Sequence, residues 1–144
     1  MTELTTEFKE FNALSLRELY DVLHLRDLVF VVGQRITAVP EVDGEDPDAT
    51  HALFRDADGR LIGTLRVFLG EQPVRVGRIA IHPDLQRGGF GTAMMHALHT
   101  FLGERPAIMH AQDYLRPWYG RLGWSAEGEP YLEADIPHIT MRRG

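Results

Sequence analysis

The sequence contains no cysteine, which excludes disulfide bonds, thiolate metal sites and a cysteine nucleophile. It also lacks an apolar run long enough to span a membrane, so we expect no membrane association. Residues 1–7 are polar and acidic, so we expect no signal peptide. Together these absences favour a cytoplasmic protein.

Basic residues are scarce as well. Lys and Arg total 15 against 21 Asp and Glu, and residues 142–143 form the only basic run. Nucleic-acid binders usually carry a basic patch, so we expect no nucleic-acid partner. The formal net charge of −6 instead favours cationic small molecules or basic peptides.

The chain of 144 residues has the size and composition of one soluble domain, with 44% hydrophobic and 25% charged residues. We therefore expect residues 1–144 to form a single domain. A monomer and a homodimer are both compatible with the sequence.

The stretch 78–92 organises the rest of the chain. It has the pattern of a strand end, a turn, a glycine-rich loop and a helix start. The first N–H groups of a helix lack partners within it, and the helix dipole adds positive charge there. Such a loop is suited to bind a phosphate group, and a glycine turn without a ligand is the alternative.

Two common nucleotide motifs do not fit this loop. The P-loop requires Lys after its last glycine, and here Thr92 follows Gly91. The dinucleotide motif requires a small residue where Met94 stands. These mismatches argue against a plain ATP- or NAD-binding domain, and the remaining pattern is Gln86-x-x-Gly89-x-Gly91.

Local patterns elsewhere predict a mixed α/β fold. Strands are expected at 8–11, 50–55, 61–68, 74–81 and 106–111, and helices at 16–30, 90–102 and 116–122. Ser15 and Glu18 form a capping box for the first helix. A closing ribbon pairs 124–127 with 139–142 around a loop at 128–138. The crossover makes 106–111 parallel to 74–81, and we expect the ligand where antiparallel pairing gives way to parallel.

Residues 33–49 are predicted to be irregular, because proline and glycine interrupt them. Five carboxylates lie between residues 41 and 48. They form either a solvated loop or one wall of a pocket for an amine. The EF-hand pattern is absent, and we expect no metal site.

Several stretches together resemble the GNAT superfamily of N-acetyltransferases. The glycine-rich loop matches its acetyl-CoA loop, and Tyr119-x-x-Leu122-Gly123-Trp124 is similar to its Tyr-x-x-Leu-Gly-Phe signature. The stretches 25–34, 43–46, 50–52, 110–112 and 136–141 resemble the ElaA-like branch more narrowly. The resemblance covers roughly residues 11 to 142. Gly33 stands where that branch usually has Glu, and the Cys-Pro-Tyr that follows Gln34 in many relatives is missing.

The resemblance implies a GNAT-like acyl-CoA N-acyltransferase fold, with a mostly antiparallel sheet, one parallel pair and flanking helices. It also implies a binding site for acetyl-CoA. The residues implied for the pyrophosphate are Gln86, Arg87, Gly88, Gly89, Phe90, Gly91 and Thr92. Those implied for the pantetheine arm and thioester are Ile79, Ala80 and Ile81. Gln112 stands seven residues before Tyr119, where the family commonly has Asn.

The implied reaction is transfer of the acetyl group to a primary amine, by direct attack in a ternary complex without an acyl-enzyme. Tyr119 is the family candidate for the acid that protonates the thiolate. Candidates for the base are His138 and His110, then Glu41 or Asp43, with His51 a weaker candidate, and a water chain is a further possibility. Residues expected to contact a small cationic amine are Gln34, Glu41, Asp43 and His51. A catalytically inactive acyl-CoA sensor on the same fold is the alternative.

Overall fold

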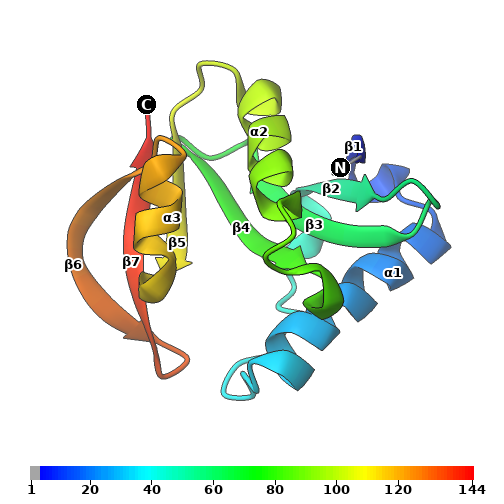
Figure 1. The fold of residues 1–144 in the computed structure, drawn as a ribbon, viewed down its shortest axis with the longest axis horizontal. Helices are drawn as coiled ribbons and strands as arrows, with labels where there is room; N and C mark the ends of the chain where they lie inside the picture. The colour runs from blue at the N-terminus through cyan, green and yellow to red at the C-terminus, as the bar shows by residue number, and fades with distance from the viewer. Residues whose placement is uncertain (1–3) are drawn as a thin grey trace.

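A computed structural model describes residues 4–144. Their strands form one seven-stranded sheet in the order β1-β2-β3-β4-β5-β7-β6 (Figure 1). The strands are β1 (Thr5–Glu10), β2 (Thr50–Arg55), β3 (Leu61–Phe68), β4 (Val74–Ile81), β5 (Ala107–Gln112), β6 (Ser125–Glu133) and β7 (Ile136–Arg143). The α-helices are α1 (Leu16–Arg26), α2 (Phe90–Leu102) and α3 (Arg116–Arg121). Short helical segments are η1 (Phe11–Ala13), η2 (Asp27–Gly33), η3 (Asp46–Asp48), η4 (Pro83–Leu85) and η5 (Asp113–Leu115).

The helix after the first strand begins at the predicted capping box. The Glu18 N–H donates to Ser15 Oγ at 3.0 Å, and the Ser15 N–H donates to Glu18 Oε1 at 2.9 Å. The α-helix ends at Arg26 rather than Phe30, and the valine-rich segment after it forms the π-helical η2. The first strand lies at 5–10 rather than 8–11, because residues 11–13 form η1.

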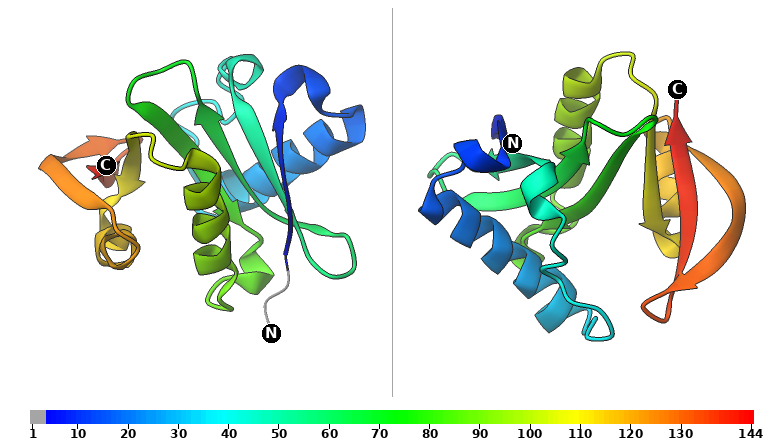
Figure 2. Two further views of the ribbon diagram at one scale, coloured as in Figure 1. Left: turned by 90° about the horizontal axis from the view of Figure 1, so that it is seen from above. Right: turned by 180° about the vertical axis from the view of Figure 1, so that it is seen from behind.

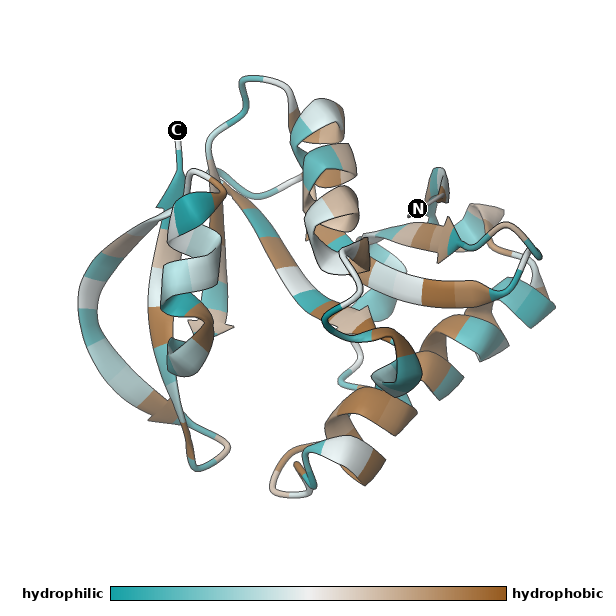
Figure 3. Cartoon of the chain, viewed as in Figure 1, coloured by the Kyte–Doolittle hydropathy of each residue, from teal (hydrophilic) through white to brown (hydrophobic). Residues whose placement is uncertain are grey.

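Helices cover both faces of the sheet (Figure 2), with α2 and α3 on one face and α1 with η2 on the other. The main core lies on the α2 face, where Met94, Met95 and Leu98 pack against apolar residues of the strands. On the opposite face Leu25 and Val29 pack against Ala80. Figure 3 shows the apolar side of α2 turned toward the sheet, and a largely hydrophilic β6 at the sheet edge. The predicted mixed sheet flanked by helices is confirmed.

A bulge in β4 divides that strand into two parts. The register with β3 shifts between Thr64↔Ala80 and Arg66↔Gly77, and Arg78 has a φ of 50°. Val74 and Val76 pack in the α2-side core before the bulge, but Ile79 packs there after it. The extra residue therefore changes which side chains of β4 meet each face.

The strands β4 and β5 are parallel, as predicted, but they pair only over a short length. Val74, Arg75 and Val76 pair with residues 107–109, and no further pair follows. Figure 1 shows the two strands close together at one end and apart at the other. The sheet thus splits beyond Val76 and Met109.

The prediction of a loop at 128–138 is wrong, because β6 extends to Glu133 and β7 begins at Ile136. The connection is a tight turn in which Ala134 and Asp135 both have positive φ, a conformation typical of two-residue hairpins. The strand β6 also shifts register between Glu127 and Tyr131, which explains the interrupted pattern in the sequence. The expected pairing of 124–127 with 139–142 is otherwise present, with β7 inserted between β5 and β6.

None of the helices in residues 4–144 has the length and apolar character needed to cross a membrane. The cytoplasmic location stays a prediction.

The core on the α2 face predicts the cost of removing one buried side chain. Leu98 is 0% exposed and Leu16 is 89% exposed. Leu98→Ala should lower the free energy of unfolding by about 2–5 kcal/mol, since it leaves a cavity. Leu16→Ala should change it by less than about 0.5 kcal/mol. Urea unfolding followed by circular dichroism measures both, and equal losses would contradict this description of the core.

Candidate active site

The glycine-rich loop starts where β4 ends. Gln86 folds back on that strand, and its Nε2 donates to the Ile81 carbonyl oxygen at 3.3 Å. Arg87 and Gly89 then take left-handed conformations, with φ values of 70° and 87°. Gly89 is the N-cap residue of α2, and only glycine adopts this conformation without strain. The loop therefore brings the start of α2 back beside the end of β4.

The N-terminus of α2 presents N–H groups that the helix does not use. Its first bond, at 3.2 Å, runs from the Ala93 N–H to the Gly89 carbonyl. The N–H groups of Phe90, Gly91 and Thr92 precede this bond and have no acceptor within the helix. A helix of 13 residues places its positive dipole end at the same point. These residues fit the pyrophosphate of an acyl-CoA.

Gly91 allows the start of α2 to lie close to its neighbours. A Cβ atom there would lie 2.9 Å from Ile81 Cδ1 and 3.1 Å from Trp118 Cζ2. Both distances are too short for a side chain without movement. The helix start is therefore packed between β4 and α3.

The backbone of Ile79, Ala80 and Ile81 borders the split in the sheet. On one side Ala80 pairs with Thr64, and Ile81 pairs with Gly63. On the other side β5 has already diverged. The open edge of β4 can pair with an extended ligand in the way of an added strand, which fits the pantetheine arm.

Polar side chains gather on β5, β7 and β6 where the split is open. Gln112 of β5 lies opposite His138 of β7, which lies opposite Tyr131 of β6. The His110 Nδ1 lies 2.6 Å from the Tyr131 hydroxyl, and the Tyr131 ring stacks on His138 with centroids 6.2 Å apart. We call these four residues, with Gln34, the polar face.

Gln34 joins the polar face from the segment that follows η2. The Gln112 Nε2 donates to Gln34 Oε1 at 2.8 Å, and the Gln34 Nε2 donates to Gln112 Oε1 at 3.4 Å. This pair ties the end of η2 to the end of β5. The structure thus brings together the predicted residues Gln34, His110, Gln112 and His138.

Tyr119 lies on the opposite face of the sheet. It is 4% exposed and belongs to the α2-side core, together with Ile139. His138, the neighbour of Ile139 in β7, points the other way because side chains alternate along a strand. Burial raises the pKa of the Tyr119 hydroxyl, so it stays protonated at neutral pH. A protonated phenol can act as an acid but not as a base.

Four of the five carboxylates of residues 41–48 form ion pairs with arginines. Glu41 Oε2 accepts from Arg26 Nε at 2.7 Å and from Arg78 Nε at 2.8 Å. Asp43 accepts from Arg66 at 2.6 Å, and that bond, together with the Glu45 N–H, outweighs burial and lowers the pKa of Asp43. The structure places Glu41 and Asp43 in a network with arginines, and the solvated acidic loop considered from the sequence does not describe them.

Asp46 and His51 lie deeper in the same network. Burial alone would raise the pKa of Asp46, but the bonds from Arg26 and Arg66, both 2.8 Å long, lower it. His51 is 1% exposed, and its Nε2 lies 2.9 Å from the Asp46 carbonyl oxygen. Burial lowers the pKa of His51. The structure does not bring His51 to the polar face.

Two residues of the site escaped the sequence analysis. Tyr131 and Glu133 lie in the stretch predicted to be a loop, and their spacing of two was the available sign of a strand. Glu133 Oε2 lies 3.4 Å from His138 Nε2.

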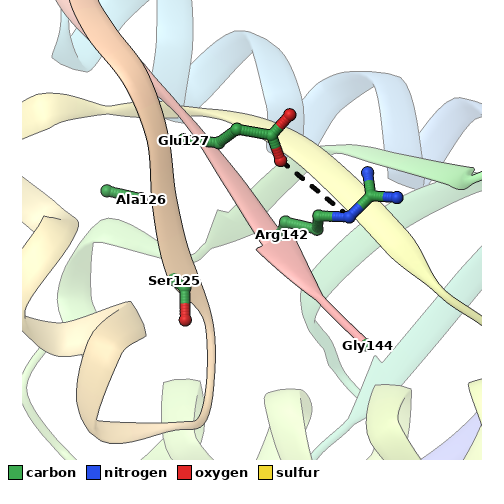
Figure 4. Close-up of a pocket in the computed structure, with 5 residues that line it drawn as sticks. All are labelled: Ser125, Ala126, Glu127, Arg142 and Gly144. Carbon is green, nitrogen blue, oxygen red and sulfur yellow. Dashed lines mark ion pairs between the residues drawn. The ribbon is translucent and has the colours of Figure 1, made fainter.

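A shallow pocket on β6 and β7 lies away from this site (Figure 4). It is lined by Ser125, Ala126, Glu127, Arg142 and Gly144. Its volume of about 210 Å³ is below the ~300–1,000 Å³ typical of ligand pockets. It lies at the end of the strands where β4 and β5 are still paired, since Arg143 pairs with Ala107.

Residues 38–143 match the Acetyltransferase (GNAT) domain family. The chain belongs to this family. A UPF0039 protein of Schizosaccharomyces pombe is 38% identical over 99% of this chain and 98% of its own length. Protein ElaA of Escherichia coli is 32% identical over 90% of both chains, so the predicted resemblance to the GNAT superfamily and to ElaA is confirmed.

Solved GNAT structures agree with the fold described above. An acyl-CoA N-acyltransferase from Pseudomonas aeruginosa has a TM-score of 0.85 at 37% identity, covering 99% of this chain and 100% of that one. Escherichia coli ElaA has a TM-score of 0.86 at 30% identity, with the same coverage. Family and fold together support acyl transfer from an acyl-CoA.

The arginine–carboxylate network predicts loss of stability in acid. The pKa values of Asp43 and Asp46 in the folded protein lie below the value of about 3.9 for an unfolded Asp. Their contribution to stability is therefore complete above that value and is lost as the pH falls toward the folded pKa. We expect the free energy of unfolding to fall steadily below about pH 4.

Asp43→Asn should make the free energy of unfolding depend less steeply on pH, because residue 43 then no longer titrates. Asp48→Asn is the control, since Asp48 is exposed and has no ion pair among residues 4–144. Urea unfolding at a series of pH values measures the slopes. A slope for Asp43→Asn equal to that of the unchanged protein would contradict the role given to the network.

Proposed function

We propose that the protein transfers the acetyl group of acetyl-CoA to a primary amine by direct attack in a ternary complex. The observation that carries this proposal is the split between β4 and β5, which leads to the unused N–H groups of α2. The polar face borders the open end of the split, and Tyr119 lies across the sheet. A ligand held in the split would therefore have candidate acid and base groups on opposite sides.

The N–H groups from Arg87 to Thr92 would bind the pyrophosphate, with Gln86 shaping the loop. The open edge of Ile79–Ile81 would pair with the pantetheine arm, and an N–H group there would polarise the thioester carbonyl. Gln112 and Gln34 would border the acyl end. These assignments rest on the backbone geometry described above.

His138 is the better candidate for the base. Its Nδ1 lies 2.7 Å from the Ile136 carbonyl oxygen, and because a carbonyl can only accept, Nδ1 carries the proton. Neutral His138 therefore has its lone pair on Nε2, where it can take a proton from the amine. His110 is the second candidate, and its Nδ1 is already bonded to the Tyr131 hydroxyl.

Tyr119 is the proposed acid. As the amine nitrogen bonds to the carbonyl carbon and the carbon–sulfur bond breaks, the phenol would protonate the departing thiolate. A proton lost by the new amide nitrogen restores the phenol. The products are the N-acetyl amine and CoA-SH.

Measuring acetyl-CoA binding tests whether the N–H groups of residues 87–92 hold the pyrophosphate. Gly89→Glu should abolish binding measured by isothermal titration calorimetry, because it places a side chain and a negative charge at the helix start. Gly59→Glu is a matched control, since Gly59 is also left-handed with a φ of 82° but lies in the β2–β3 turn. The control should bind as well as the unchanged protein. If the unchanged protein binds no acetyl-CoA, the proposal is wrong.

Tyr119→Phe tests the acid. It should lower kcat for CoA-SH release about 100-fold and leave acetyl-CoA affinity unchanged, because general acid catalysis contributes ~10²–10⁴-fold. Tyr20→Phe, which changes a 69% exposed tyrosine, should have no effect. Full activity of Tyr119→Phe would remove Tyr119 from the mechanism. Tight binding with no turnover on any amine would favour the sensor instead.

A further inference from the structure

Glu133 differs from the carboxylates of the acidic loop. Glu41, Asp43 and Asp46 each accept bonds from arginines. Within residues 4–144, Glu133 has no arginine or lysine partner, and its only ion-pair neighbour is His138. Its side chain is 56% exposed at the end of β6. A cationic ligand can therefore reach this carboxylate without displacing an arginine.

When His138 is neutral, its contact with Glu133 lacks a proton donor. The Nδ1 proton of His138 is used by the Ile136 carbonyl, so neutral His138 directs a lone pair from Nε2 toward Glu133. Glu133 Oε2, 3.4 Å away, is also an acceptor. A donor placed between or beside two acceptors that face each other can form a hydrogen bond to each of them. An alkylammonium group carries three N–H donors and one positive charge, as a lysine side chain does.

The position of this acceptor pair suits the reaction. His138 lies opposite Gln112, at the end of β5 that borders the split. Adjacent strands lie about 4.8 Å apart, so the β7 backbone at His138 is one strand away from the edge of β5 that borders the split. The side chain of His138 is 8% exposed and that of Glu133 is 56% exposed, so solvent screens the contact between them in part.

We propose that Glu133 determines specificity by receiving the cationic amine beside His138. This inference rests on the proposed function. The ammonium first donates to Glu133, then gives one proton to His138 Nε2, and the neutral nitrogen attacks the thioester. Glu133 next stabilises the imidazolium by accepting from its new N–H. In balance, one alkylammonium and one acetyl-CoA give one N-acetyl amine, one CoA-SH and one proton released to solvent.

The test compares a charged with an uncharged acceptor. An alkyl diamine is cationic at neutral pH, whereas an arylamine is not. Glu133→Gln should raise KM for the diamine about 5- to 10-fold, the lower range for a half-exposed charged contact. KM for the arylamine and the Kd for acetyl-CoA should stay unchanged. Glu133→Asp should restore part of the diamine KM, because it restores the charge.

Glu129→Gln is the matched control. Glu129 lies in the same strand and is exposed, and among residues 4–144 it forms no hydrogen bond or ion pair with His138, an arginine or a lysine. It removes the same charge and should leave both KM values unchanged. Titration of the diamine into the CoA-SH complex, followed by calorimetry, gives the same comparison without turnover.

The outcomes separate this inference from the proposed function. An equal rise of KM for both amines in Glu133→Gln, no rise for either, or an equal rise in Glu129→Gln would overturn the role of Glu133. In each case acetylation itself would stand. An unchanged protein that binds no acetyl-CoA, or acetylates no amine, would instead overturn the proposed function on which the inference rests.

Discussion

The site depends on one constraint, the end of pairing between β4 and β5 after Val76 and Met109. A parallel pair that continued would use the backbone groups of Ile79–Ile81 within the sheet. Because the strands diverge, these groups remain at an open edge, and the polar face and Tyr119 come to lie on opposite sides of it. The start of α2, packed against Ile81 through Gly91, lies beside the end of that edge.

The bulge at Arg78 lies just beyond the last paired residues of β4 and β5, and its backbone conformation has a cost. A residue other than glycine with positive φ costs about 1–3 kcal/mol. The Arg78 side chain bonds to Glu41 Oε2 at 2.8 Å and to the Glu41 carbonyl at 3.2 Å, and these bonds offset that cost. Glu41 also holds Arg26 of α1. The acidic loop therefore connects α1 to the bulge. Glu41, which the sequence suggested as a contact for an amine, has a structural role here.

Much of the fold followed from local patterns. The capping box at Ser15, the hairpin at 50–68 and the helix at 90–102 each depend on residues close in sequence, and all are present. The glycine-rich loop could be predicted from the sequence for the same reason, since a helix start depends on residues close in sequence. What could not be read were the long-range pairings. The Arg78 bulge and the arginine network depend on contacts between residues 15 to 37 positions apart in the sequence.

The β6–β7 hairpin illustrates the limit most clearly. Gly128 and Pro130 interrupt the pattern of β6, and the register shift that accommodates them is visible only when β7 is in place. Treating this region as a loop hid Tyr131 and Glu133, and with them the surroundings of His138. His110 and His138 could be identified as candidates from the sequence, but their neighbours Tyr131 and Glu133, which distinguish the two histidines, could not.

A crystal structure of the protein with CoA tests the central claim most directly. The account predicts the pyrophosphate at the N–H groups of residues 87–92 and the pantetheine arm paired with the open edge of Ile79–Ile81. CoA bound elsewhere, for example at the shallow pocket between β6 and β7, with β4 and β5 unoccupied at their split, would contradict it.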